Sequence, residues 1–116
     1  MNELLQISEE EIYLNELTNS NDWEDLCIHF PLSEKIIEEF QDKMNWRQIS
    51  TFQRLSESFI EKYQDKVNWR SISIYQKLSE NFIKKHADKV NWNFIFKYQK
   101  LSLSFTMKYL YKIKEG

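Results

Sequence analysis

The sequence predicts an all-α protein, a short α-solenoid of four 23-residue, two-helix repeats with an N-terminal capping helix, and three observations carry this prediction. Tryptophan recurs at an interval of 23 residues, at Trp23, Trp46, Trp69 and Trp92. The pair Leu-Ser returns at the same interval, at positions 32–33, 55–56, 78–79 and 101–102. The 116 residues include one Gly and one Pro, so few residues suit the turns of β-hairpins. A fixed period of this size indicates one structural unit that is copied and stacked.

Length and composition fit a single domain with a continuous core. Hydrophobic residues make up 41% of the chain and aromatic residues 16%, which predicts a folded protein although 29% of the residues are charged. We divide the chain into an N-terminal cap and four repeats, over residues 1–21, 22–44, 45–67, 68–90 and 91–113.

The N-terminal cap is expected to contain a helix over about residues 9–18. Ser8 and Glu11 match the capping box, and Ile7 with Ile12 match the hydrophobic staple that accompanies it. This helix would cover the otherwise open end of the first repeat and turn several glutamates to solvent, as a terminal cap of a repeat array should.

The sequence of each repeat predicts two short helices, as the second repeat illustrates. Asn45 is a good helix N-cap, and Met44 and Ile49 on either side of it are placed as a staple. Ser56 is a second cap, and these paired signals favour helix pairs over a leucine-rich repeat, which needs a strand pattern with alternating leucines. Because helices this short are not stable alone, stacking has to supply their stability. The helices expected in this repeat cover roughly residues 46–53 and 57–65.

The last helix, over about residues 103–112, differs from the others because it is apolar on more than one face. We expect it to pack back and close the stack, and the alternative is an end that is ready for a partner. Its apolar residues include Phe105, Met107, Tyr109, Leu110 and Tyr111.

Equivalent positions of the repeats should stack into columns, so the repeat alignment also maps the surface. We expect the tryptophan column to lie in the core or at its edge, although a base-stacking platform would also use aromatic rings. A second aromatic column runs through His29, Phe52, Tyr75 and Tyr98, and the column beside it holds Phe30 followed by three glutamines. We expect this combination either to line a groove for a partner or to seal the turn between helices. The groove candidates are Tyr75, Tyr98, Gln76 and Gln99.

Charge is distributed very unevenly along the chain. Residues 1–42 carry twelve acids and one lysine, which gives −11, and the remainder carries six acids and fifteen bases, which gives +9. Acidic candidates for a protein contact are Glu9, Glu10, Glu38 and Glu39. Basic columns that could follow a phosphate backbone are Arg54, Lys77, Lys100 and Lys62, Lys85, Lys108.

Catalysis has little support in the sequence. Cys27 and His29 lie two apart on a short helix and so point in different directions, which does not suit a nucleophile and its base. His86 takes the place of an aromatic residue in a column, and one Cys with two His gives no metal-ligand set of the usual spacing. We therefore expect no enzyme, no metal and no cofactor. The single Cys, the absence of a signal-peptide pattern and the lack of a long apolar run predict a cytoplasmic protein without a membrane partner.

Residues 65–83 read DKVNWRSISIYQKLSENFI. This unit resembles a short tandem repeat of the form DKVNWxxISxYQxLSExFI that recurs in proteins of giant DNA viruses, bacteriophages and related mobile elements. The resemblance covers about residues 22–113. It departs from the pattern at Phe30 and Pro31 in the first repeat and at Phe94 and Phe96 in the fourth. It implies a repeat scaffold of viral or phage origin and supplies no catalytic or ligand residues.

These observations together predict a non-enzymatic helical-repeat module that binds another protein. The resemblance adds the hypothesis of a viral or phage inhibitor of a host defence protein, acting in the host cytoplasm. Two alternatives stay open. One is nucleic-acid binding along the basic columns, and the other is head-to-tail self-association, in which the acidic first repeats dock on the last helix of a neighbour.

Overall fold

The computed structural model describes Ile12 and residues 23–113, and all regular secondary structure in this part of the chain is helical. This confirms the all-α class. The predicted capping helix over residues 9–18 lies outside the described residues apart from Ile12, which is helical and 47% exposed.

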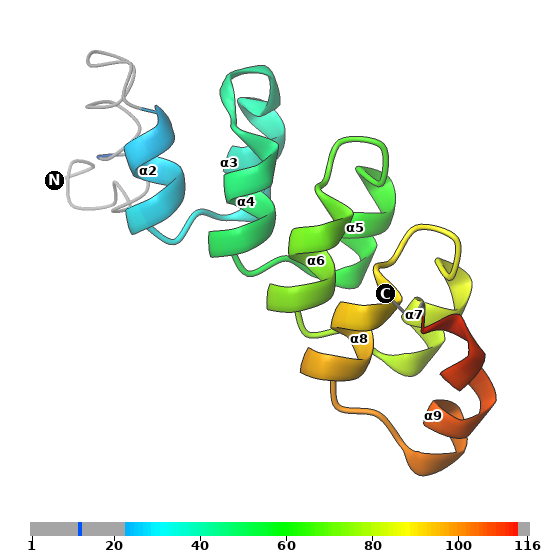
Figure 1. The fold of residues 1–116 in the computed structure, drawn as a ribbon. Helices are drawn as coiled ribbons and strands as arrows, with labels where there is room; N and C mark the ends of the chain where they lie inside the picture. Colours follow the sequence, from blue (N-terminus) through cyan, green and yellow to red (C-terminus); the bar gives the residue numbers. More distant parts are fainter. Residues whose placement is uncertain (1–11, 13–22, 114–116) are drawn as a thin grey trace, which may run out of the picture.

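Helices recur at the interval of the tryptophans (Figure 1). The first helices of the repeats each begin at a tryptophan, and they are α2 (Trp23–His29), α4 (Trp46–Phe52), α6 (Trp69–Tyr75) and α8 (Trp92–Tyr98). The second helices are α3 (Glu34–Glu39), α5 (Glu57–Lys62), α7 (Glu80–Lys85) and α9 (Leu103–Tyr109). Two short 3-10 helices follow α3 and α9, η2 (Gln41–Lys43) and η3 (Leu110–Lys112).

The predicted caps are confirmed. Asn45, Asn68 and Asn91 each accept a hydrogen bond from the backbone N–H three residues on, at 3.1, 2.9 and 3.2 Å. Ser33, Ser56, Ser79 and Ser102 cap the second helices in the same way. Helix α5 ends three residues before the predicted boundary, because Tyr63 leaves the helical conformation and its carbonyl then accepts from the N–H groups of Lys66 and Val67.

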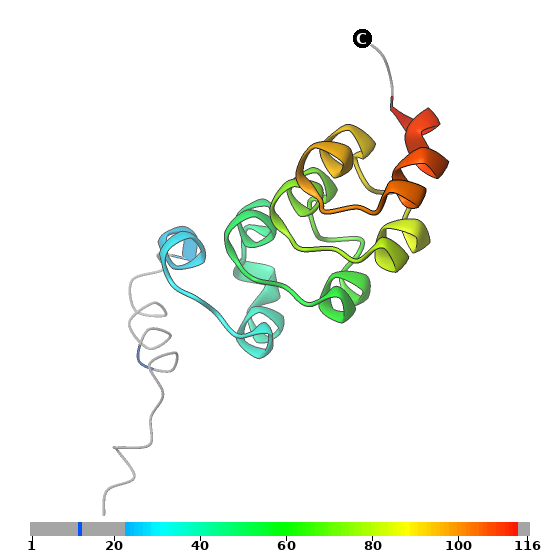
Figure 2. The same ribbon diagram turned by 90° about the horizontal axis from the view of Figure 1, so that it is seen from below.

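The first helices stack directly on one another, α2 on α4, α4 on α6 and α6 on α8. Figure 2 shows them in one row and the second helices in another. The core lies between the two rows and includes one column of isoleucines from each, all fully buried. These residues are Ile49, Ile72 and Ile95 from the first helices and Ile37, Ile60 and Ile83 from the second.

The tryptophans lie in the core or at its edge, as predicted. The indole N–H groups of Trp46, Trp69 and Trp92 donate to the carbonyl five residues earlier, at 3.1, 2.9 and 2.9 Å. The interpretation of His86 as a ring in an aromatic position is also confirmed, since its ring centroid lies 5.3 Å from that of Trp69.

The last helix closes the core with one face and leaves another face open. Phe105 is buried, and the ring of Tyr109 stacks on Trp92 with 5.1 Å between centroids. The expectation of a closed stack therefore holds for this face alone. Four apolar or aromatic side chains of α9 and η3 are more than half exposed, and they are Leu103, Met107, Leu110 and Tyr111.

Candidate binding surface

A glutamine follows each of the first helices α4, α6 and α8, and its side chain is bonded to the backbone of the preceding repeat. Gln76 is 5% exposed, and its Oε1 accepts a hydrogen bond from the backbone N–H of Leu55 at 3.0 Å. Its Nε2 donates to the carbonyls of Ser50 and Gln53, at 2.9 and 2.6 Å. Gln53 and Gln99 make the same three contacts with the repeat before them. We call Gln53, Gln76 and Gln99 the glutamine row.

Each amide of the glutamine row therefore joins two repeats and uses three of its hydrogen-bonding positions on backbone groups. Buried polar groups are costly unless they are paired, so these bonds fix the register between repeats. The structure places Gln76 and Gln99 in the turn between two helices, which is the sealing role considered above. Their amides are consequently bonded to the backbone, although Gln76 also lines one of the hollows described below.

The residues on either side of each glutamine lie on the outside. The backbone at the glutamines is extended, and neighbouring side chains of an extended segment point to opposite sides. Phe52, Tyr75 and Tyr98 are accordingly 54%, 59% and 50% exposed. Arg54, Lys77 and Lys100, which follow the glutamines in the sequence, are also exposed. We call these six residues the aromatic–basic strip.

Two shallow hollows accompany the strip. One, of about 470 Å³, lies between the second and third repeats and is lined by Phe52, Arg54, Tyr75 and Lys77 among others. The other, of about 810 Å³, continues from Phe52 and Tyr75 across α4 and α6 to Arg47 and Arg70. No Asp or Glu is among the described residues that line either hollow. The surface is therefore positive as well as aromatic.

The two predicted basic columns have different surroundings. Lys62 and Lys85 form ion pairs with the preceding repeat, to Glu38 and to Glu61, the latter at 2.9 Å. Hydrogen bonds from these lysines lower the pKa of the Glu38 and Glu61 carboxyls, and the bond to Glu38 raises the pKa of Lys62. Within residues 23–113, no ion pair or hydrogen bond engages the side chains of Arg54, Lys77 and Lys100. Among the described residues, no acid therefore neutralises the basic side chains of the aromatic–basic strip.

The remaining candidates divide as follows. Glu38 forms an ion pair with Lys62, whereas Glu39 is exposed on the same helix. Glu9 and Glu10 lie outside the described residues. Lys108 has no acid opposite it, because Lys84 stands at the position that Glu38 and Glu61 occupy in earlier repeats.

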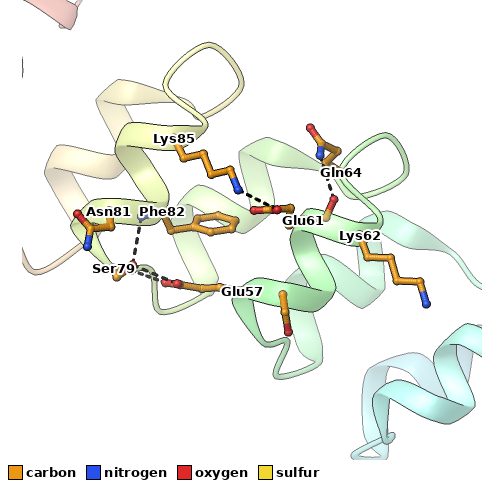
Figure 3. A pocket seen from close by; sticks show the side chains of 9 residues that line it. Glu57, Glu61, Lys62, Gln64, Ser79, Asn81, Phe82 and Lys85 are labelled. Carbon is orange, nitrogen blue, oxygen red and sulfur yellow. Dashed lines mark hydrogen bonds and ion pairs between the residues drawn. The ribbon is translucent and has the colours of Figure 1, made fainter.

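A third hollow, of about 600 Å³, lies between α5 and α7 on the other row of helices (Figure 3). Several of its polar groups bind one another. Glu57 accepts from the backbone N–H and the hydroxyl of Ser79 at 2.6 and 3.1 Å, and Glu61 pairs with Lys85. These contacts join successive repeats, so the hollow is part of the scaffold.

Groups that could support chemistry are sparse in the described part. Cys27 is fully buried, and burial raises the pKa of its thiol, which lowers the fraction of reactive thiolate. The imidazole of His29 lies 3.3 Å from Asp25 on the surface of the same helix. Residues 23–113 and Ile12 contain no cluster of three side chains that could hold a metal ion. Among the same residues, no helix has the length and apolar character needed to cross a membrane.

The sequence could not reveal the two hollows or the division between the two basic columns. Both depend on which side chains of adjacent repeats meet, and the only local signal was the repeated triplet of an aromatic residue, Gln and a base. Comparison of the chain with protein-family models, with curated proteins and with solved structures found no match. The resemblance to a tandem repeat of viral and phage proteins therefore stays a prediction.

Proposed function

We propose that the chain is a short α-solenoid of four repeats and a non-enzymatic module that binds another protein along the aromatic–basic strip. The observation that carries this proposal is the row of three half-exposed aromatic rings, each beside a basic side chain without an ion pair. Exposed rings cost little conformational entropy when they bind, and aromatic residues and arginine supply much of the energy of protein interfaces.

The chemistry of the strip defines the partner. Stacked helices lie about 8–10 Å apart, so successive rings should repeat at about that distance. An extended peptide advances about 3.3 Å per residue, so acidic side chains at roughly every third position could meet Arg54, Lys77 and Lys100 in turn. The apolar residues between them would contact the rings. We therefore expect a partner segment with an acidic residue at about every third position and apolar residues between them.

Affinity capture of the full chain from lysate of its own biological setting tests this proposal. The capture is run with and without nuclease, using wild type and the strip variant Tyr75→Ser/Lys77→Glu. The matched control is Asn81→Ser/Lys84→Glu on exposed positions of α7. We expect a protein that survives nuclease, is lost with the strip variant and is kept with the control. Equal recovery by both variants would remove the strip as the binding surface.

A second candidate function, binding of single-stranded nucleic acid, uses the same strip. Its supporting observation is that aromatic rings and basic side chains alternate along the two hollows, with no Asp or Glu among the described residues that line them. Proteins that bind single strands use the same combination, because nucleobases stack on the rings and phosphates meet the basic side chains. Direct titration of labelled DNA and RNA at two salt concentrations tests it. Affinity that falls steeply with salt and is lost in Lys77→Glu/Lys100→Glu supports this function, and no binding at low salt rejects it.

The hypothesis of a viral inhibitor of a host defence protein can be tested separately, because it assigns the contact to the acidic N-terminal region. An acidic surface could occupy the basic nucleic-acid channel of a defence nuclease. Reversal of Glu9, Glu10 and Glu39 should then relieve inhibition. Glu38 is left unchanged in this test, because its loss would also break the ion pair with Lys62. Unchanged inhibition would exclude this mode of action.

A further inference from the structure

The contacts between internal repeats identify the positions that face the next repeat along the chain. Glu57 accepts from Ser79, Glu61 pairs with Lys85, and Gln41 in the first repeat contacts Lys66 and the hydroxyl of Tyr63. We call the contacts made from these positions the polar ladder. They are hydrogen bonds and ion pairs at the outer edges of the first two junctions, around a buried isoleucine core. At the third junction Glu80 keeps the contact to Ser102, whereas Lys84 and Ala87 stand at the other two positions.

In the fourth repeat the same three positions are all apolar. Leu103 stands where Glu57 stands, Met107 where Glu61 stands and Leu110 where Gln41 and Gln64 stand. These side chains are 76%, 68% and 52% exposed, and Tyr111 beside them is 75% exposed. Leu103 and Met107 are four residues apart on one face of α9, and Leu110 and Tyr111 follow in η3. We call these four residues the end face.

The end face is apolar where the equivalent positions of the second repeat are polar. Contiguous exposed apolar residues usually indicate an interaction site. Here the fourth repeat replaces polar ladder residues of the internal repeats by Leu, Met and Leu at a position that water would otherwise reach. Burial of these residues requires another surface.

We propose that the end face is a second interaction surface, separate from the aromatic–basic strip, and that it docks an amphipathic helix of another protein. The apolar stripe of the end face has the spacing of a helix-packing seam. The segments α9 and η3, which carry the end face, also contain Lys108 and Lys112, and residues 103–113 contain no acid. The docked helix therefore carries Asp or Glu on the flanks of its apolar face, which complements this charge.

A second copy of the chain fits the end face poorly in either arrangement. A two-fold pairing of end faces would bring together two surfaces that both carry Lys108 and Lys112, so like charges would approach one another. A head-to-tail pairing with the geometry of the internal junctions would set Met107 against Glu39, because Glu39 stands where Lys62 and Lys85 stand. That contact would cover a carboxylate with an apolar side chain and give it no partner.

The test titrates the full chain with a synthetic amphipathic peptide of about 20 residues, long enough to form a helix, labelled for fluorescence anisotropy. The peptide has leucines on one face and glutamates on the flanks, and its counterpart has lysines in place of the glutamates. The test variant is Leu103→Glu/Met107→Glu, which restores the residues that the second repeat carries. The matched control, Ser58→Glu/Asn81→Glu, adds the same charge at exposed positions of α5 and α7.

We expect the glutamate-flanked peptide to bind at least about tenfold more tightly than the lysine-flanked one. The end-face variant should lose at least about tenfold in affinity, and the matched control and the strip variant should bind as wild type does. Circular dichroism and thermal melting of the end-face variant should match wild type, because both substituted side chains are exposed. Because the strip variant should still bind the peptide, a failure of the end-face proposal can be told apart from a failure of the proposed binding along the strip.

Three results would overturn the proposal. The first is no binding of the glutamate-flanked peptide at millimolar concentration. The second is equal affinity of wild type and the end-face variant. The third is sedimentation of wild type as a dimer or a growing oligomer that Leu103→Glu/Met107→Glu converts to monomer, because a second copy would then be the occupant.

Discussion

The junction between the second and third repeats and the outer end of the fourth use the same positions of the repeat in opposite ways. At the junction, Glu57 and Glu61 hold Ser79 and Lys85 across the gap. At the end, Leu103 and Met107 stand at these positions and are exposed. The comparison teaches that polar contacts at the edge of a junction, around a buried core, select which repeat packs on which. An end without those contacts is suited to a different neighbour.

Removal of a ring from the middle of the stack should have the largest effect. Trp69→Ala deletes a side chain that stacks on Phe82 and donates to the carbonyl of Gln64, so we expect a loss of about 3–5 kcal/mol in the free energy of unfolding. Urea denaturation followed by circular dichroism measures it. Asn81→Ala, at an exposed position of α7, is the control. A loss as small as that of the control would mean that Trp69 is a surface residue.

The glutamine row gives the next effect. Gln76→Ala leaves the N–H of Leu55 and the carbonyls of Ser50 and Gln53 without their partner, so we expect a loss of about 2–4 kcal/mol. The neighbouring change Lys77→Ala should cost less than about 0.5 kcal/mol, because that side chain is exposed. Denaturation of the two variants compares them directly. Equal stability would contradict the role of the amide in joining repeats.

Glu57→Leu converts an internal junction to the chemistry of the end face. It removes two hydrogen bonds to Ser79 at an exposed edge, for which we expect a loss of about 1 kcal/mol. Ser58→Leu adds the same apolar side chain on the same helix without breaking a bond to another repeat and should change stability less. Thermal melting of the two variants distinguishes them. If both melt alike, the polar ladder does not stabilise the junction.

The ion pairs predict a small dependence on pH. The pKa of the Glu38 and Glu61 carboxyls lies below the ordinary value of 4.5, mainly through hydrogen bonds from Lys62 and Lys85. A carboxyl with a lowered pKa stabilises the fold above the pKa of the unfolded chain, and this contribution disappears as the pH falls through the folded pKa. The difference in Tm between wild type and Lys62→Gln/Lys85→Gln should therefore shrink below pH 4.5. A difference that stays constant down to a pH of about 2 would contradict these pairs.

The sequence predicted the features whose causes are local. The caps at Asn45 and Ser56 and the position of the tryptophans in the core or at its edge follow from signals within a few residues, and the structure confirms them. The contacts of Gln76 and Lys85 could not be predicted in this way, because their partners lie 21 to 26 residues away in the preceding repeat. A polar residue in a column has the same pattern whether it binds a neighbouring repeat or solvent.

Hydrogen–deuterium exchange of the full chain, with and without the protein that it captures, tests the central claim most directly, because it shows where that partner lies. If the aromatic–basic strip is the binding surface, the amides at residues 52–54, 75–77 and 98–100 should gain protection. Protection confined to the second helices α3, α5 and α7, with these three segments unchanged, would contradict the account.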